Sequence, residues 1–345
     1  MTDDRRRRFL ESFKARHSTD DVLEAVASLR ALRVLVVGEA IIDEYSYCAP
    51  MGKAPKDPVI SAKRLRLERH AGGALACANH VAGFCGEVHL VTCLGADGEE
   101  RFVRERLKSN VTSRFVIRDG APTTTKRRYV SEPGFLKMFE VAVMDDTPLP
   151  ARLEDALVVQ LAAALPTCDA VIVTDYGHGL LGPRAAGVLA ERARFLAVNT
   201  QANPGNVGFN VVTKYPHADY VCLDEGEIRL ATRDRWSPVA ELVGIVSKQL
   251  GCRAISVTLG DRGALMRGAD GLDREIPALA RDVVDRMGAG DAYLAITAPC
   301  VAVGLPMDVA GFLGAAVAGL AVGIVGNRAS VDAAAVRRAV VELLT

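Results

Sequence analysis

Short, continuous runs of β-branched and other apolar residues recur along this 345-residue chain, and helix-like segments separate most of them. Runs of this length without polar alternation are typical of strands buried on both faces of a sheet. The runs lie at residues 33–43, 88–95, 170–177, 195–199, 219–224 and 253–260. Strands that alternate with helices form βαβ units, whose strands run parallel. The sequence therefore predicts an α/β fold, a doubly wound, mostly parallel central sheet with helices on both faces and ligands at the carboxyl ends of its strands.

Two segments, residues 47–70 and 123–146, interrupt this alternation. Both show the period-two pattern of strand pairs, with turns at Pro and Gly and several Lys and Arg residues. We expect excursions at about 45–70 and 115–146 to form one small antiparallel β lid; the alternative is a pair of ordinary edge hairpins. The domain plan is then a solvated, helical N-terminal arm over residues 1–30 and one α/β domain over residues 31–345.

Composition excludes several classes of protein. Lys+Arg and Asp+Glu both number 42, and this neutral balance argues against a protein that coats nucleic acid. The eight cysteines form no C-x-x-C pair, which favours reduced thiols in a cytoplasmic protein. No apolar signal segment follows the Arg-rich start of the chain. The uncharged stretch 309–326 is mostly Gly and Ala, so we expect a closely packed buried helix and no membrane partner.

The sequence Gly288-Ala289-Gly290-Asp291 stands where a polar segment gives way to an apolar, helix-like run. Unpaired N–H groups and the helix dipole make such a turn an anion hole. An acid in the first turn stays ionised and can accept a proton from a hydroxyl group during phosphoryl transfer. The alternative is an ordinary helix start with an N-terminal acid, which a lone G-A-G-D would favour. No Walker-type loop is present, and Gly38 stands alone after the first strand, so an oxidoreductase with a dinucleotide site has no support.

Four motifs carry a resemblance to a known family. They are G-G at 72–73 with Asn79, L-D-E-G-E at 223–227, S-V-T-L-G-D-R-G-A at 256–264, and D-R-M-G-A-G-D-A-Y at 285–293. In this order the chain resembles the ribokinase-like (PfkB) carbohydrate kinases over roughly residues 31–340. A-P-K-D-P-V before G-G-A, and T-T-T-K-R-R-Y-V in the second excursion, are most similar to D-glycero-β-D-manno-heptose-7-phosphate kinases.

The resemblance implies a ribokinase-like fold and a role for each matching residue. Asp291 is implied as the catalytic base, and Gly288, Ala289 and Gly290 as the anion hole. The implied sugar-binding residues are Asp43, Gly72, Gly73 and Asn79. The implied nucleotide-binding residues are Thr258, Gly260 and Gly263. The implied residues for magnesium are Glu227 and Asp224. ATP and Mg²⁺ are the implied cofactors.

Three departures from the family pattern leave details open. Asp224 stands where the family's N-x-x-E motif has Asn, and Ala315 where relatives often carry an Asn that faces adenine. Arg286 and Met287 replace the small or β-branched residues usual before G-A-G. The nucleotide preference and a requirement for a monovalent cation therefore stay open.

The expected lid concentrates positive charge in a neutral chain, at Lys53, Lys56, Arg64, Arg66, Lys126, Arg127, Arg128 and Lys137. Such an excess favours an anionic ligand, and Lys126 and Arg128 are the expected contacts to a substrate phosphate. The alternative is that these are solvated strand charges. His178 is expected to be a satisfied loop residue. Apolar residues on an exposed lid edge favour a homodimer that pairs lid to lid.

The predicted function is thus ATP-dependent phosphorylation of a sugar or sugar phosphate, with heptose 7-phosphate converted to the 1,7-bisphosphate as the best match. Kinases of a free sugar, a nucleoside or a fructose phosphate are the alternatives. A non-catalytic relative that binds sugar or nucleotide is another.

Overall fold

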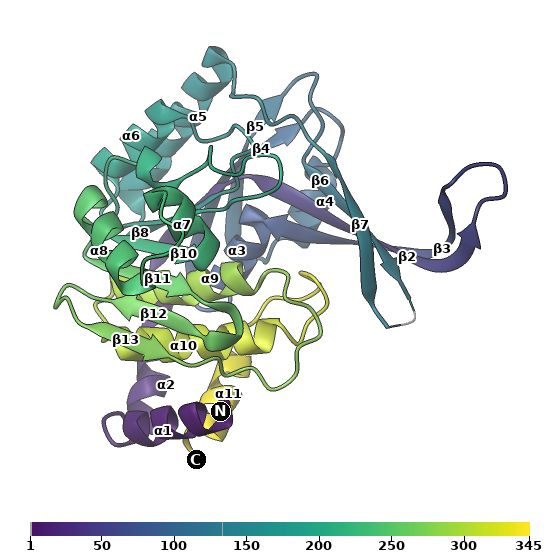
Figure 1. Ribbon diagram of the computed structural model, residues 1–345. Coiled ribbons are helices and arrows are strands. Elements are labelled where there is room, and N and C mark those ends of the chain that lie inside the picture. Colours follow the sequence, from purple (N-terminus) through teal and green to yellow (C-terminus); the bar gives the residue numbers. More distant parts are fainter. Residues whose placement is uncertain (1, 133) are drawn as a thin grey trace.

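A nine-stranded sheet forms the centre of the computed structural model, which describes residues 2–132 and 134–345 (Figure 1). Its strands, in spatial order, are β13 (Asp273–Ile276), β12 (Ala264–Arg267), β11 (Ala254–Thr258), β10 (Tyr220–Asp224), β9 (Leu196–Thr200), β8 (Ala170–Asp175), β1 (Arg33–Gly38), β4 (Glu87–Gly95) and β5 (Val111–Arg118). Neighbours from β11 to β5 pair in parallel, and only β12 and β13 at one edge pair antiparallel. The predicted doubly wound, mostly parallel sheet is confirmed.

Helices cover both faces of this sheet because alternate residues of each strand point to opposite sides. On β1, Val34 and Val36 belong to one buried cluster, and Leu35 and Val37 belong to another. The first cluster packs against α3 (Ala74–Val81), α4 (Glu100–Arg106), α9 (Ala289–Ala302), α10 (Met307–Ala321) and α11 (Ala333–Leu344). The second packs against α5 (Ala151–Ala164), α6 (Pro183–Arg192), α7 (Glu225–Thr232) and α8 (Val239–Leu250).

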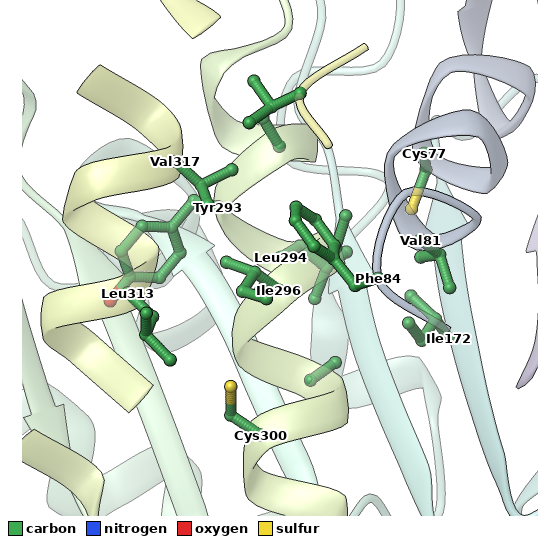
Figure 2. Packing of buried hydrophobic residues seen from close by; sticks show 14 of the residues in the cluster. Cys77, Val81, Phe84, Ile172, Tyr293, Leu294, Ile296, Cys300, Leu313 and Val317 are labelled. Carbon is green, nitrogen blue, oxygen red and sulfur yellow. The ribbon is translucent and has the colours of Figure 1, made fainter. Parts of the chain in front are cut away.

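Helix α9 lies within the larger cluster, between α10 and α3 (Figure 2). Its neighbour α10 holds residues 309–321 of the uncharged stretch 309–326, so the predicted buried helix is confirmed over these residues, and residues 322–326 form turns after it. A Cβ at Gly314 would lie only 2.6 Å from side-chain atoms of Tyr293 and Thr297, so the glycine lets the two helices approach closely. No helix in the described part of the chain is both long and apolar enough to cross a membrane. All eight cysteines are free thiols, as predicted.

The N-terminal arm consists of α1 (Thr2–Lys14) and α2 (Thr19–Ser28), which lie beside α11 (Figure 1). The Phe13 side chain is fully buried, and its ring stacks on that of Phe312 with centroids 4.5 Å apart. Arg16 and His17 both bond the Asp308 carboxylate at the start of α10. The arm is therefore docked on the core, and the expectation of a solvated arm was wrong, because its apolar stripe finds a partner in α10.

A second, four-stranded sheet forms the lid and projects from the body (Figure 1). Its spatial order is β3 (Ile60–Gly73), β2 (Ala40–Lys53), β6 (Thr125–Ser131) and β7 (Leu136–Val143). The two hairpins, β2–β3 and β6–β7, are antiparallel as expected, but they join through the parallel pair β2–β6. Residues 115–118 belong to β5 of the large sheet, so the second excursion starts later than the expected residue 115.

Candidate active site

A cavity of about 430 Å³ lies between the lid and the carboxyl ends of the central strands. Most of the residues singled out from the sequence line it: Asp43, Gly73, Lys126, Arg128, Asp224, Glu227, Thr258, Gly260, Gly288, Gly290 and Asp291. Strand ends and lid excursions that are far apart in the chain therefore meet at one place, as the parallel topology requires.

Asp291 lies in the first turn of α9 and faces this cavity. The Tyr176 hydroxyl, just past the end of β8, donates to Asp291 Oδ1 over 2.6 Å. Burial raises the pKa of Asp291 to about 6, against the lowering effect of the Tyr176 hydrogen bond, while Asp43 adds to the rise and Lys126 opposes it. The carboxylate is therefore ionised at neutral pH and basic enough to accept a proton from a hydroxyl group.

The turn before Asp291 presents open backbone to the cavity. Gly288 has a φ of 77°, and a Cβ there would lie 2.3 Å from Asn327 Oδ1, so only glycine fits. A Cβ at Gly290 would meet nothing within 4 Å. The Ala289 N–H donates to the Arg286 carbonyl over 3.4 Å, so the N–H groups that an anion could reach are those that follow it, at Gly290 and Asp291.

Asp43 on β2 is buried at the lid end of the cavity. Arg128 bonds its Oδ1, and Asn327 Nδ2 donates to its Oδ2 over 2.8 Å. A Cβ at Gly72 would lie 2.2 Å from Asp43 Oδ2, so this glycine makes room for the carboxylate. Gly73, with a φ of 57°, lines the cavity itself. Each carboxylate oxygen has two lone pairs, so Asp43 can still accept from a sugar hydroxyl.

The residues that line the cavity do not include four of the expected ones, namely Gly72, Ala289, Asn79 and Gly263. Asn79 on α3 donates to the Arg106 carbonyl and accepts from the Lys108 N–H, both over 2.9 Å. Its side chain holds the end of α4 and contacts no lining residue by a hydrogen bond in the described part of the chain. Gly263 has a φ of 96°, and a Cβ there would lie 1.9 Å from the Ile276 carbonyl oxygen, so it permits a tight turn before β12.

The expected cluster of lid bases separates into paired and unpaired side chains. Arg128 bonds Asp43 and Glu140, and Lys137 lies 2.5 Å from Asp285. Carboxylates also neutralise two further bases, Arg66 and Arg127.

Lys126 differs from these bases. It lines the cavity and forms no ion pair within residues 2–132 and 134–345, and its ammonium lies 6.0 Å from the centre of the Tyr176 ring. Burial lowers the pKa of Lys126. Arg286, in the turn before Gly288, also lines the cavity without an ion pair to any described residue.

Asp224 and Glu227 form a capping box at the start of α7. Asp224 Oδ1 accepts from the Glu227 N–H over 2.8 Å, and Glu227 Oε2 accepts from the Asp224 N–H over 2.7 Å. Burial and the neighbouring Asp224 raise the pKa of Glu227 to about 8. Mg²⁺ in nucleotide sites takes one or two carboxylates plus phosphates and water, and this pair fits that demand. The described residues hold no cluster of three metal-ligating side chains.

Sequence reasoning gave no role to three residues that organise this site: Tyr176, Asp285 and Asn327. Tyr176 lies at the carboxyl end of the predicted strand 170–177, and Asp285 opens the motif at 285–293, so both positions could have marked them. Asn327 lies in a loop without local signal, although it touches both Asp43 and Gly288. His178 lines a smaller neighbouring cavity, and its buried Nε2 has no partner among the described residues, so it is not the satisfied residue that was expected.

An ionised base beside a helix N-terminus is what transfer of a phosphoryl group to a hydroxyl group demands, because the proton leaves as the phosphate charge arrives. The site thus has the chemistry of a phosphotransferase that acts on an alcohol. Comparison with known proteins agrees, since residues 31–334 match the family model described as pfkB family carbohydrate kinase. The chain belongs to this family and is a carbohydrate kinase.

Individual curated relatives share about 30% of their residues with this chain over the matched length. The Bifunctional protein HldE of Koribacter versatilis is 30% identical over 296 residues, which cover 85% of this chain and 59% of that protein. The protein of the same name from Rhodopseudomonas palustris (strain BisA53) is 30% identical over 313 residues, or 88% of this chain and 62% of that protein. The chain therefore spans less than two thirds of the length of these curated relatives.

Solved structures share the fold. Phosphofructokinase-2 from Escherichia coli in complex with potassium gives a TM-score of 0.74 at 12% identity, covering 91% of this chain and 100% of that one. Arabidopsis thaliana ribokinase complexed with ribose and ATP gives 0.64 at 20% identity, covering 91% and 99%. At these identities the likeness establishes the ribokinase-like architecture.

Proposed function

We propose that this carbohydrate kinase uses ATP to phosphorylate a hydroxyl group of a sugar that already carries a phosphate. Heptose 7-phosphate, converted to the 1,7-bisphosphate, is the substrate that the sequence resemblance favours. The observation that supports the proposal is Lys126, a partly buried cation that lines the cavity beside Tyr176 without an ion pair to any described residue. A charge that is partly removed from water is stabilised by a counter-charge, and a substrate phosphate would supply one.

The proposed reaction follows from the positions of the side chains. The acceptor hydroxyl would lie against Asp291, which takes its proton as the oxygen bonds to the γ-phosphorus of ATP. The bond from that phosphorus to the β–γ bridging oxygen breaks at the same time, and ADP leaves. Tyr176 holds the Asp291 carboxylate toward the cavity. The open N–H groups around Gly290 meet the transferred phosphoryl oxygens. Asp224 and Glu227 would hold Mg²⁺, which neutralises phosphate charge when bound.

The ion pairs of the basic side chains indicate which of them are available to hold the substrate phosphate. Arg128 and Lys137 are engaged by buried carboxylates, so they are poorer candidates than the sequence suggested. Lys126 on the lid and Arg286 in the turn keep free positive charge in the same cavity. We therefore assign the sugar phosphate to Lys126 in the first place, with Arg286 as the second cation.

Replacing Lys126 with Met should raise the KM for the sugar phosphate about tenfold or more, because a charge-assisted hydrogen bond to phosphate contributes about 1.5–3 kcal/mol. The KM for ATP should stay nearly unchanged. Turnover is measured at pH 8, because loss of the Lys126 charge raises the pKa of Asp291 and the base must stay ionised. Lys63→Met, an exposed lysine on β3, is the matched control and should leave both KM values unchanged.

The same assay tests the alternatives with a panel of free sugars, nucleosides, fructose phosphates and heptose 7-phosphate, with and without K⁺. Preference for a phosphorylated sugar supports the proposal. Equal use of free and phosphorylated sugars, together with an unchanged KM in Lys126→Met, would refute the proposal that the substrate carries a phosphate. Absence of turnover with every compound, despite binding, would favour the non-catalytic relative.

We also infer a homodimer formed through the lid. The two edge strands of the lid sheet, β3 and β7, expose several large apolar side chains, namely Ile60, Leu65, Leu67, Leu136, Phe139 and Val141. Exposed strand edges with apolar faces tend to pair with another chain. Light scattering at micromolar concentration should give twice the 36.7 kDa mass of one chain. A mass of one chain at that concentration would contradict the inference.

A further inference from the structure

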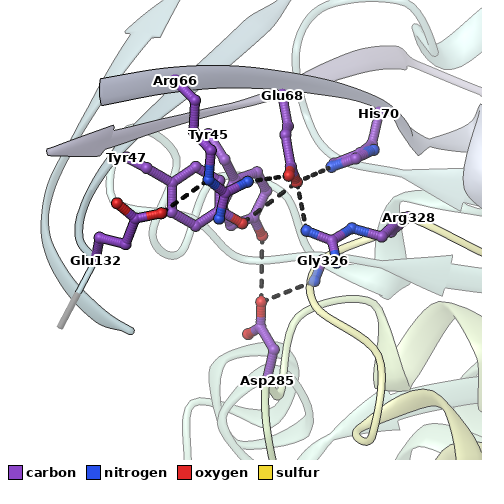
Figure 3. A network of polar contacts seen from close by, with 9 residues as sticks. All are labelled: Tyr45, Tyr47, Arg66, Glu68, His70, Glu132, Asp285, Gly326 and Arg328. Atoms are coloured by element: carbon purple, nitrogen blue, oxygen red, sulfur yellow. Dashed lines mark hydrogen bonds and ion pairs between the residues drawn. The ribbon is translucent and has the colours of Figure 1, made fainter. Parts of the chain in front are cut away.

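The carboxylate of Asp285 joins the lid to the turn that leads into the anion hole. It is buried and accepts from four groups. The Met287 N–H lies 3.1 Å from Oδ1, and the Gly326 N–H lies 2.9 Å from Oδ2. Lys137 Nζ lies 2.5 Å from Oδ1, and the Tyr45 hydroxyl donates to Oδ2 over 3.3 Å. Figure 3 shows Asp285 reaching up toward Tyr45, with Gly326 beside it.

These four donors come from two different parts of the molecule. Met287 and Gly326 belong to loops of the body, on either side of α9 and α10. Lys137 lies on β7 and Tyr45 on β2, both strands of the lid. Burial alone would raise the pKa of Asp285, but the bonds from Lys137, Met287 and Gly326 hold it below its usual value. The charge of Asp285 is thus compensated fully only while the lid is in place.

Packing fixes the lid at this point. The Tyr45 ring lies against Gly326, where a Cβ would be 2.8 Å from the hydroxyl oxygen, so glycine is needed for the close approach. The Lys137 ammonium lies 5.9 Å from the centre of the same ring. A second bridge leaves the same loop, because Arg328 donates to Glu68 on β3 over 2.6 Å (Figure 3). Lid and body therefore meet through directed contacts of charged and aromatic side chains.

We propose that Asp285 is a positioning residue that couples closure of the lid to the shape of the anion hole, with Lys137 as the charged contact between them. When the lid lifts, Lys137 and Tyr45 leave, and water reaches the Asp285 carboxylate and competes for the bond that orients Met287 next to Gly288. When substrate draws the lid down, the turn regains its shape. Phosphoryl transfer to water is thereby disfavoured while the cavity is open. The inference rests on the proposed role of the 288–290 turn in phosphoryl transfer.

A double-mutant cycle on Lys137 and Asp285 tests this coupling. Lys137→Met should lower kcat about 2- to 30-fold, the range expected when a coupling contact is lost. Asp285→Asn keeps the shape and removes the charge, and should lower kcat similarly. If Lys137 acts through Asp285, adding Lys137→Met to the Asp285→Asn protein should cost little more. Equal losses from Lys137→Met in both backgrounds would overturn the proposal.

Backbone hydrogen exchange gives a readout that does not depend on the reaction. The amides of residues 286–290 should exchange faster in Lys137→Met than in the wild type, and Lys63→Met should not change them. Unchanged exchange in Lys137→Met would overturn the coupling even if the protein stays an active kinase. Should Lys137→Met fail to fold, Tyr45→Phe removes only one hydroxyl donor, and it must also speed exchange in this turn.

Discussion

Replacing Asp291 with Asn should lower kcat about 10²- to 10⁴-fold, the usual effect of losing a general base. Asn keeps the shape of the side chain and can still accept from Tyr176, but it cannot take a proton. The folded state already disfavours the charged form of Asp291, so the variant should be at least as stable as the wild type. Turnover and a thermal melt measure the two effects. Asp282→Asn, an exposed acid in the same loop, is the control and should leave turnover unchanged.

The pH dependence of kcat/KM is a second test of the assignment of Asp291 as the base. Asp291 acts in its ionised form, so kcat/KM should hold above its pKa of about 6 and fall tenfold per pH unit below it. Burial also raises the pKa of Glu39 to about 7 and of Glu227 to about 8, so the assignment needs a variant. Tyr176→Phe removes a bond to the charged form of Asp291 and should move the acidic limb to higher pH. A limb that stays in place in Tyr176→Phe, or an active Asp291→Asn, would show that Asp291 is not the base.

The sheet, the lid and the position of Asp291 at a helix start could be predicted because each depends on a local pattern. Buried apolar runs at fixed intervals specify parallel strands, and a glycine turn before an acid specifies a helix start that binds anions. The parallel topology then brings those strand ends to one edge without further information. Asp43 and Asp291 therefore meet the same cavity although 247 residues separate them in the sequence, as their residue numbers show.

Side-chain partners could not be predicted, because they depend on which strands of the lid lie next to each other. Arg128 looks like any strand base in the sequence, and only the parallel pairing of β2 with β6 sets it opposite Tyr45, near Asp43. Asn79 looks like a ligand-binding residue in the sequence, but its side chain accepts a hydrogen bond from the backbone N–H of Lys108. The docking of the N-terminal arm could not be predicted either, because the sequence does not show that α10 packs against the arm's apolar stripe.

Arg128 carries the second large expected effect. Its guanidinium and the Asp43 carboxylate are both buried, at 4% and 3% exposure, and they bond each other. Removing one member of a buried ion pair leaves an uncompensated charge and costs about 3–5 kcal/mol. Arg128→Met should therefore lower the free energy of unfolding, measured in urea, by about that amount. Glu140, which also bonds Arg128, is partly exposed and can turn to solvent.

Two comparisons separate this structural role from the substrate contact that sequence suggested. Arg64→Met, an exposed arginine on β3, should change the unfolding free energy by no more than about 0.5 kcal/mol. Combining Arg128→Met with Asp43→Asn should cost less stability than Arg128→Met alone, because no buried carboxylate is then left without a partner. A stable Arg128→Met protein in which only the KM for sugar phosphate rises would contradict this view. Arg128 would then hold the substrate phosphate, and the ion pair with Asp43 would be the resting state that substrate displaces.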